Sequence, residues 1–310
     1  MSGQVTTGRT GLEREIAPAP SLRRARRRRN LAPYALLAPA GIFLAIFFAW
    51  PMVQALLMAF RDAAGGFTLN YFRQMLTDVN FWPAVRNTLL LILAIVPLQM
   101  VLALIMALLL QSGLRGTSFW LYAWAIPLAI SDLAAGIVWL SIFTDRGYLN
   151  SLLVGLGLSR TGFSFLSYEH PLSNFLAVVI AEAWRATSIV MVILVAGLQV
   201  IPKEYGEAAE VFGATAWQRL RYVTLPLLRP SIQVALILRT ILAFQVFAVV
   251  IALAGRNLPV LAREAYYWYG SYSNPNVAAA YALLIMLFSI ANTGIYLRAL
   301  RTRDEEVGML

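Results

Sequence analysis

Six long apolar segments constrain the fold of this chain more than any other feature of its sequence. They cover residues 33–59, 87–111, 120–143, 174–200, 226–254 and 277–299. A helix needs about 20 mostly apolar residues to cross the hydrocarbon layer of a bilayer, and each segment is long enough. None has the alternating pattern of a barrel strand. We therefore predict an all-α integral membrane protein with six transmembrane helices.

The composition agrees with this prediction. Hydrophobic residues make up 60% of the 310-residue chain and charged residues only 13%, against about 45–50% and about 25% in a soluble protein. The chain has no Cys and a single His, which excludes disulfides, zinc–thiolate sites and multi-histidine metal sites. We expect no metal and no cofactor in this chain, and we expect His170 to lie at the surface of an outer loop.

A basic block precedes the first apolar segment. Residues 1–30 contain eight Arg and two Glu, and six of these Arg lie between positions 23 and 29. A basic block next to an apolar helix is typical of a cytoplasmic anchor that contacts anionic membrane lipids. We therefore expect lipid contacts and no nucleic-acid partner.

Charge also predicts the topology. With the tail in the cytoplasm, the cytoplasmic segments hold 16 of the 25 Lys and Arg residues and the outer loops hold seven. This bias favours six crossings with both termini in the cytoplasm. The predicted parts are a basic cytoplasmic tail at 1–30, an uncleaved first transmembrane helix at 31–60, a five-helix core at 86–300 and a cytoplasmic C-terminus at 301–310.

The sequence does not resemble an enzyme. Its only lysine, Lys203, follows Pro202, so the phosphate-binding pattern G-x-x-x-x-G-K-[ST] is missing. The patterns G-x-S-x-G and H-E-x-x-H of hydrolases and zinc proteases are missing as well. We expect this chain to hydrolyse no ATP.

One polar segment, residues 201–226, lies between the fourth and fifth apolar segments. Its pattern predicts two short helices around Gly213, which permits a positive φ, with Thr215 capping the second helix. In that second helix we expect one apolar face, with Arg219 and Arg221 displaced from it. The apolar face consists of Trp217, Leu220 and Val223.

This segment resembles a known family. Glu207-Ala208-Ala209, Gly213 and Val223-Thr224-Leu225-Pro226 are similar to the E-A-A-x3-G-x9-I-x-L-P loop of ABC importer permeases, with Val in place of Ile. Further pieces resemble the sugar-uptake branch, the maltose and glycerol-3-phosphate type permeases. They are Asn87-Thr88, Gly147-Tyr148-Leu149-Asn150, Ala183-Trp184-Arg185 and Ala196-Gly197-Leu198.

The resemblance implies a type I ABC importer fold, located in a bacterial inner membrane, with an ATPase-coupling loop at 203–226. It also implies the partners: a second homologous permease subunit, two cytoplasmic ABC ATPase subunits and an extracytoplasmic solute-binding protein. The residues expected to couple to the ATPase are Glu207, Ala208, Ala209, Phe212, Gly213, Leu225 and Pro226. Phe212 either anchors in the ATPase groove or staples the two short helices together.

The sequence departs from the branch near these positions. Members often have Asp-Gly-Ala where this chain has Phe212-Gly213-Ala214, and an Asp where it has Ala248. They also commonly have a glycine-rich loop where this chain reads Ala254-Gly255-Arg256-Asn257-Leu258-Pro259. These departures leave the solute open.

Four ionisable residues fall at the depth of the apolar segments, where charge is costly and usually faces a bundle interior or a water-filled cavity. Glu182 and Arg185 are three residues apart and are able to pair on one helix face; this pairing is the favoured interpretation. The other interpretation is a polar lining of a translocation path. The four residues are Asp132, Glu182, Arg185 and Arg239.

Aromatic residues gather just before the sixth apolar segment. Such rings commonly anchor a protein at the membrane interface. Since sugars stack on aromatic rings, a solute gate or a contact with the binding protein is the alternative, with Tyr267 and Trp268 as the candidates. The cluster consists of Tyr266, Tyr267, Trp268, Tyr269 and Tyr272.

Together these features predict the permease subunit of an ATP-driven carbohydrate importer. A permease for glycerol phosphate, a polyamine or another small solute is the alternative within the same class. A stand-alone ion-driven carrier or channel is the alternative from a different class. It is disfavoured because we find no inverted repeat and only two acidic residues at span depth, Asp132 and Glu182.

Overall fold

The computed structural model describes residues 33–62, 64–113 and 115–299. The basic tail predicted at 1–30 and the C-terminus predicted at 301–310 lie outside the described residues. The chain divides into two compact units, residues 1–55 and 56–310, and each is considered by itself. Within the described residues the structure is helical, with one isolated bridge between Arg61 and Phe67.

The described residues of the first unit belong to one apolar helix, which continues past the boundary at residue 55. This helix runs from Pro33 to Met58 and is long and apolar enough to cross a membrane. It contains a π-helical turn, η1 (Ala45–Ala49), which leads into α2 (Trp50–Met58). The turn lies directly before Pro51, whose missing N–H disturbs the regular hydrogen-bond ladder of a helix at this point.

The second unit contains the remaining helices. Together with the first helix, the described residues have five helices long and apolar enough to span a membrane, or six if one bent pair counts as a span. The elements are α3 (Asn70–Thr77), α4 (Phe81–Gln111), α5 (Thr117–Ala125), η2 (Ile126–Ala129), α6 (Asp132–Phe143), α7 (Tyr148–Gly155), α8 (Pro171–Val200), α9 (Lys203–Val211), α10 (Ala216–Arg219), η3 (Leu220–Thr224), α11 (Leu225–Phe244), α12 (Ala248–Ala254), α13 (Leu261–Gly270) and α14 (Pro275–Ala299).

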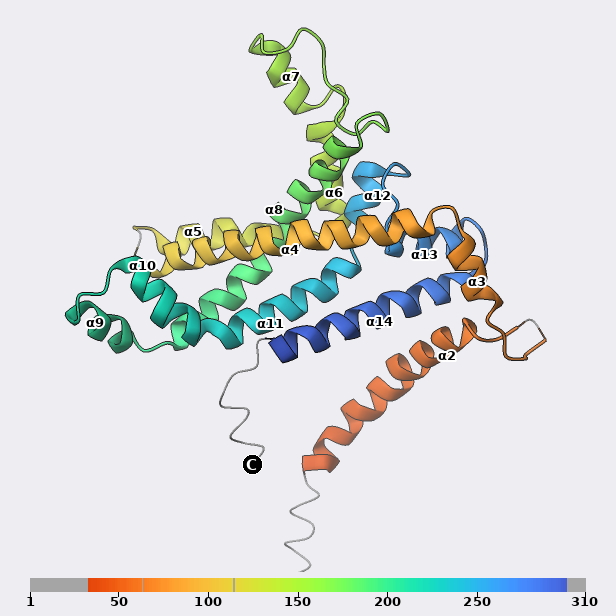
Figure 1. Ribbon diagram of the computed structural model, residues 1–310, viewed down its shortest axis with the longest axis horizontal. Helices are drawn as coiled ribbons and strands as arrows, with labels where there is room; N and C mark the ends of the chain where they lie inside the picture. Colours follow the sequence, from red (N-terminus) through yellow and green to blue (C-terminus); the bar gives the residue numbers. More distant parts are fainter. Residues whose placement is uncertain (1–32, 63, 114, 300–310) are drawn as a thin grey trace, which may run out of the picture. The chain divides into compact units, whose positions relative to one another are not determined.

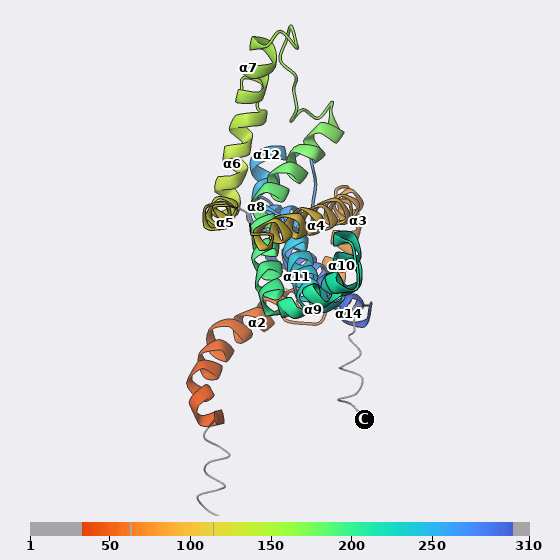
Figure 2. The same cartoon turned by 90° about the vertical axis from the view of Figure 1, so that its left-hand side faces the viewer.

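The third predicted span is not one continuous helix. It bends by 101° between the helical stretches Thr117–Ala129 and Asp132–Gly155. Ile130 and Ser131 are extended, and the Ser131 hydroxyl caps α6 by accepting a hydrogen bond of 3.3 Å from the Ala134 N–H. A Ser cap marks the beginning of a helix. α6 is therefore a separate helix from α5, and the chain changes direction between them (Figure 2).

The fifth predicted span, 226–254, is also interrupted. α11 ends at Phe244, and α12 begins at Ala248 after a short non-helical link. α12 packs on α6 at Gly136, where an added Cβ would lie 2.6 Å from the Cβ of Ala252. The interruption thus separates α11 from a short helix that packs closely on α6.

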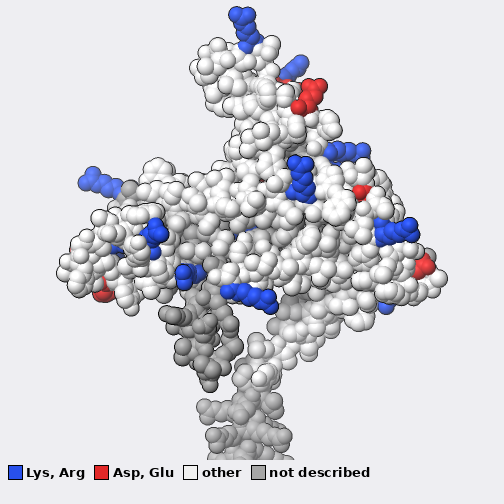
Figure 3. Space-filling model, viewed as in Figure 1, with Lys and Arg blue, Asp and Glu red and all other residues white. Residues whose placement is uncertain are grey.

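α8 is the central helix of the second unit. Of its most apolar 18-residue stretch, 61% is buried, compared with 28% for α4. α8 contacts α4, α6, α11 and α12, and Figure 1 shows α4, α11 and α14 running side by side. Most of the face drawn in Figure 3 carries neither acidic nor basic side chains, as a surface in contact with lipid requires.

Candidate functional site

The predicted coupling loop begins with α9, which ends in a glycine cap. Gly213 has φ +80°, as predicted. Its N–H donates to the Glu210 carbonyl at 2.8 Å, and the Ala214 N–H donates to the Ala209 carbonyl at 2.9 Å. This pair of bonds is a Schellman motif, which satisfies the last carbonyls of the helix and turns the chain sharply.

α10 begins directly after this turn with a capping box. The Thr215 hydroxyl accepts a hydrogen bond of 3.3 Å from the Gln218 N–H, and the Gln218 side chain accepts one of 2.7 Å from the Thr215 N–H. The predicted cap is thereby confirmed. α10 continues through η3 into α11 without a break, so the second helix of the loop and the membrane-spanning helix form one continuous helix.

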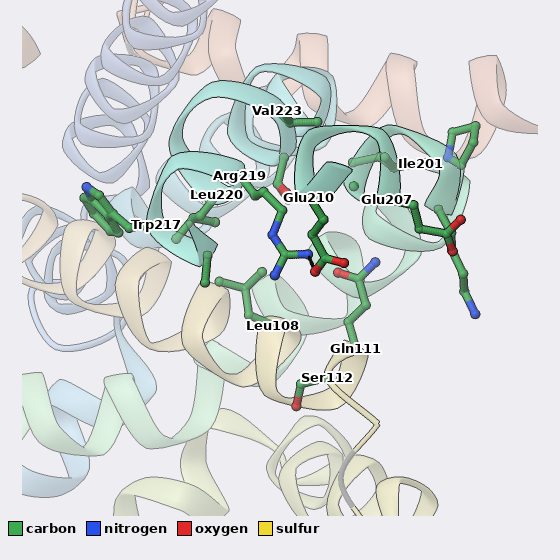
Figure 4. Close-up of a pocket in the computed structure, with 15 residues that line it drawn as sticks. Leu108, Gln111, Ser112, Ile201, Glu207, Glu210, Trp217, Arg219, Leu220 and Val223 are labelled. Atoms are coloured by element: carbon green, nitrogen blue, oxygen red, sulfur yellow. Dashed lines mark hydrogen bonds and ion pairs between the residues drawn. The ribbon is translucent and has the colours of Figure 1, made fainter. Parts of the chain in front are cut away.

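A cavity of about 640 Å³ is lined by the C-terminal end of α4 and by α9, α10 and η3 (Figure 4). Trp217, Leu220 and Val223 line it, in agreement with the predicted apolar face. The prediction that Arg219 is displaced from this face was wrong. Its guanidinium points into the cavity and pairs with the Glu210 carboxylate of α9. This ion pair joins the two short helices of the loop.

Several predicted coupling residues lie on the open surface of the loop. Phe212 is 90% exposed, so its ring does not staple the two short helices together. Glu207, Ala208 and Pro226 are exposed, whereas Ala209 and Leu225 are partly buried. The exposed part of the loop therefore presents a carboxylate, small side chains and an aromatic ring to whatever binds there.

The four predicted ionisable residues lie together in one cluster. The Arg185 guanidinium lies 3.2 Å from the Glu182 carboxylate, which confirms the predicted pairing, and 2.8 Å from the Asp132 carboxylate. Glu182 also binds Arg239, at 2.9 Å. The cluster thus connects α6, α8 and α11 through two carboxylates and two guanidinium groups.

Gln99 of α4 belongs to this cluster and was missed by the sequence analysis. Its side-chain N–H donates to the Glu182 carbonyl at 2.7 Å, and its side-chain oxygen accepts a hydrogen bond from Arg239. Gln99, Glu182 and Arg239 are each at most 1% exposed. A Gln within a long apolar segment was the signal that could have found it, since a buried amide needs polar partners.

The aromatic cluster before α14 is tied to acidic and basic residues. The Trp268 indole N–H donates to the Asp78 carboxylate at 2.7 Å, and the Tyr281 hydroxyl donates to the same carboxylate at 3.3 Å. The guanidinium groups of Arg256 and Arg263 lie 5.4 and 5.1 Å from the centre of the Tyr267 ring. These contacts give both predicted aromatic candidates a local structural role.

α13 also contains a buried ion pair. The Arg263 guanidinium lies 2.8 Å from the Glu264 carboxylate. Burial raises the pKa of the Glu264 carboxyl, and Arg263 opposes that shift. The preceding chain is held by α4, because Asn87 donates to the Pro259 carbonyl at 3.0 Å and Thr88 accepts from the Leu261 N–H at 3.0 Å.

His170 is exposed, as predicted, and its ring stacks on Phe163 with the ring centres 4.7 Å apart. Across the residues that the structure describes, no group of three or more His, Asp or Glu side chains is arranged to hold a metal ion.

Residues 87–301 match the family described as the binding-protein-dependent transport system inner membrane component. The chain belongs to this family. The matched range begins at Asn87 and covers most of α4 and every later element to α14. The geometry above therefore describes a multi-pass permease subunit of an ABC importer, within the class that serves sugars and glycerol phosphate.

Two relatives and one solved structure are similar to this permease over most of its length. The sulfoquinovosyl glycerol transport system permease protein SmoG of Agrobacterium fabrum is 31% identical and covers 87% of this chain and 90% of its own. The trehalose/maltose transport system permease protein MalF of Thermococcus litoralis is 33% identical and covers 76% and 80%. A bacterial alginate ABC transporter, solved with an alginate pentasaccharide-bound periplasmic protein, matches with TM-score 0.71 and 25% identity, covering 88% and 95%.

Proposed function

We propose that this permease carries a carbohydrate across a bacterial inner membrane in an importer driven by ATP. The similar permeases named for trehalose and maltose and for sulfoquinovosyl glycerol support a carbohydrate, as does the alginate transporter. The importer would contain a second homologous permease, two cytoplasmic ABC ATPases and a solute-binding protein outside. ATP hydrolysis belongs to the ATPases, and this chain would need neither a metal nor a cofactor.

The observation that carries the ATP-driven part of this proposal is the way in which the loop from α9 to α11 is built. The Schellman turn, the capping box and the Glu210–Arg219 ion pair hold α9 and α10 as one body. α10 is continuous with α11. A force applied to α9 from the cytoplasm would therefore move α11 as a rigid lever and would not dissipate in a flexible loop.

The lever would act on the centre of the permease. α11 contacts α4, α8 and α14, and Arg239 of α11 binds Glu182 of α8 in the buried cluster. When ATP closes the ATPase dimer, movement of α9 would shift α11 against α8 and switch the spans from inward-facing to outward-facing. The binding protein would then deliver the solute, and both termini of the chain would remain in the cytoplasm.

Single-cysteine labelling tests the orientation, and the chain has no Cys to remove first. Ala216 at the start of α10 is exposed, and Ser159 after α7 is partly exposed. An impermeant maleimide should label Ser159→Cys in intact spheroplasts and Ala216→Cys only after the membrane is opened. Labelling of Ala216→Cys in intact spheroplasts would refute the proposed topology.

Transport is tested with the full importer in membrane vesicles. Trehalose, maltose and a polyamine are offered as radiolabelled probes, with ATP or with a non-hydrolysable analogue inside. We expect carbohydrate uptake that requires ATP. We also expect this uptake to require an ATPase that co-purifies with the permease. Uptake that persists without the ATPase would favour an ion-driven carrier and overturn the proposal.

A further inference from the structure

Asp132 is the one residue of the buried cluster with a widely accessible side chain. Its side chain is 53% exposed, compared with 18% for Arg185 and 1% for Glu182 and Arg239. The carboxylate contacts Arg185 at 2.8 Å. Any molecule that approaches the cluster from this side meets Asp132 first and Arg185 directly behind it.

Two features indicate that this side faces water or another protein and not lipid. A half-exposed carboxylate within an apolar span is costly in hydrocarbon. Asp132 also follows the extended residues Ile130 and Ser131 at the 101° bend of the span. Non-helical backbone at membrane depth is tolerated only when it is buried in protein or lines a water-filled cavity.

Asp132 occupies the part of Arg185 that a solute would otherwise bind. The Arg185 Nη1 contacts the Asp132 carboxylate, whereas Nη2 and Nε bond to the Glu182 carboxylate. With two carboxylates and two guanidinium groups the cluster is formally neutral. A guanidinium with a free edge is a strong binding group for carboxylate, sulfonate or phosphate, and Asp132 covers that edge.

We propose that Asp132 determines the charge selectivity of the solute path. By neutralising Arg185 it keeps the path free of net positive charge, so that the permease favours uncharged carbohydrates over sugars carrying a carboxylate, sulfonate or phosphate group. Loss of Asp132 would expose Arg185 and create a site for such anions. This inference rests on the proposed function, because it requires a transported solute. The inference itself places Asp132 in the path of that solute.

A charge-paired thiol assay tests the inference without knowledge of the natural solute. The Asp132→Cys variant is prepared in membranes that hold the full importer and treated with methanethiosulfonates of opposite charge, sulfonatoethyl and trimethylammonioethyl. Each rate is divided by the rate of the same reagent with a free thiol in solution. We expect the anionic reagent to be favoured by roughly tenfold, since a single guanidinium within a few ångströms sets the local potential.

Arg185 supplies the matched controls. Combining Asp132→Cys with Arg185→Gln should abolish the preference for the anionic reagent, whereas Arg185→Lys should retain it because the charge remains. In a second background, Ser131→Cys with Asp132 intact should show no preference, and adding Asp132→Asn should create one. This second pair keeps the test decisive even when Asp132→Cys does not reach the membrane.

Two results would overturn the inference. Absence of reaction at both positions 131 and 132 would show that this side of α6 does not face water. Equal normalised rates for the two reagents after loss of Asp132 would show that Arg185 exerts no field on the path. Co-purification of the ATPase, measured on the same samples, tests the proposed function separately, because the labelling rates do not depend on it.

Discussion

The guanidinium of Arg239 on α11 lies 2.9 Å from the carboxylate of Glu182 on α8, and both side chains are 1% exposed. The pair connects the helix that continues the coupling loop to the central helix of the permease. Removing one member of a buried ion pair leaves an uncompensated charge, which is far more costly than removing both members.

We therefore predict that Glu182→Gln or Arg239→Gln alone destabilises the protein by about 3–5 kcal/mol. The double variant should be more stable than either single variant, because Asp132 and Arg185 still neutralise each other. Thermal unfolding of the detergent-purified protein and its abundance in the membrane are the measurements. A double variant as unstable as the sum of the single losses would show that charge balance does not govern this cluster.

The sequence predicted the features that depend on local chemistry. Apolar segments of sufficient length became helices, Gly213 took a positive φ, and Thr215 capped α10. The pairing of Glu182 with Arg185 followed from their spacing on one helix. In each of these cases the decisive interactions lie within a few residues along the chain.

The features that were missed depend on contacts between different helices or on a local signal that was concealed. The role of Gln99 requires Glu182 and Arg239 on other helices, and no local pattern places them together. The bend before α6 had a local signal in Ser131-Asp132, a typical helix start, but the apolar residues around it concealed that signal. Arg219 was placed wrongly because its partner, Glu210, lies on the preceding helix.

Gly213→Val should impair coupling, whereas Gly206→Ala should not. No atom lies within 4 Å of a Cβ added at either glycine, but only Gly213 has a positive φ, of +80°. The valine therefore adds backbone strain of about 1–3 kcal/mol without a clash, and the turn between α9 and α10 should relax. Solute uptake and ATPase co-purification, normalised to membrane abundance, measure the effect. Equal uptake by both variants would mean that the turn geometry is not required.

Glu207→Lys should abolish uptake while leaving the permease folded and inserted. The residue is exposed, so we expect its carboxylate to contact the ATPase through a charge-assisted hydrogen bond worth about 1.5–3 kcal/mol. Loss of that bond weakens docking by about ten- to a hundredfold, and the reversed charge adds repulsion. Glu204→Lys makes the same charge change one turn earlier and is the control. Wild-type uptake by Glu207→Lys would mean that the loop is only a surface helix and does not dock to the ATPase.

Gly197→Ala should destabilise the contact between α8 and α11, and a second substitution should restore it. An added Cβ at Gly197 would lie 2.1 Å from the Ser231 Oγ and 2.6 Å from its Cβ, so the helices must separate at a cost of about 1–3 kcal/mol. Ser231→Gly removes both atoms and leaves only the Leu228 Cδ1 at 2.9 Å, the flexible end of a side chain. The double variant Gly197→Ala/Ser231→Gly should therefore unfold at a higher temperature than Gly197→Ala alone. Purely additive losses in this double-mutant cycle would show that the two residues do not set the distance between the helices.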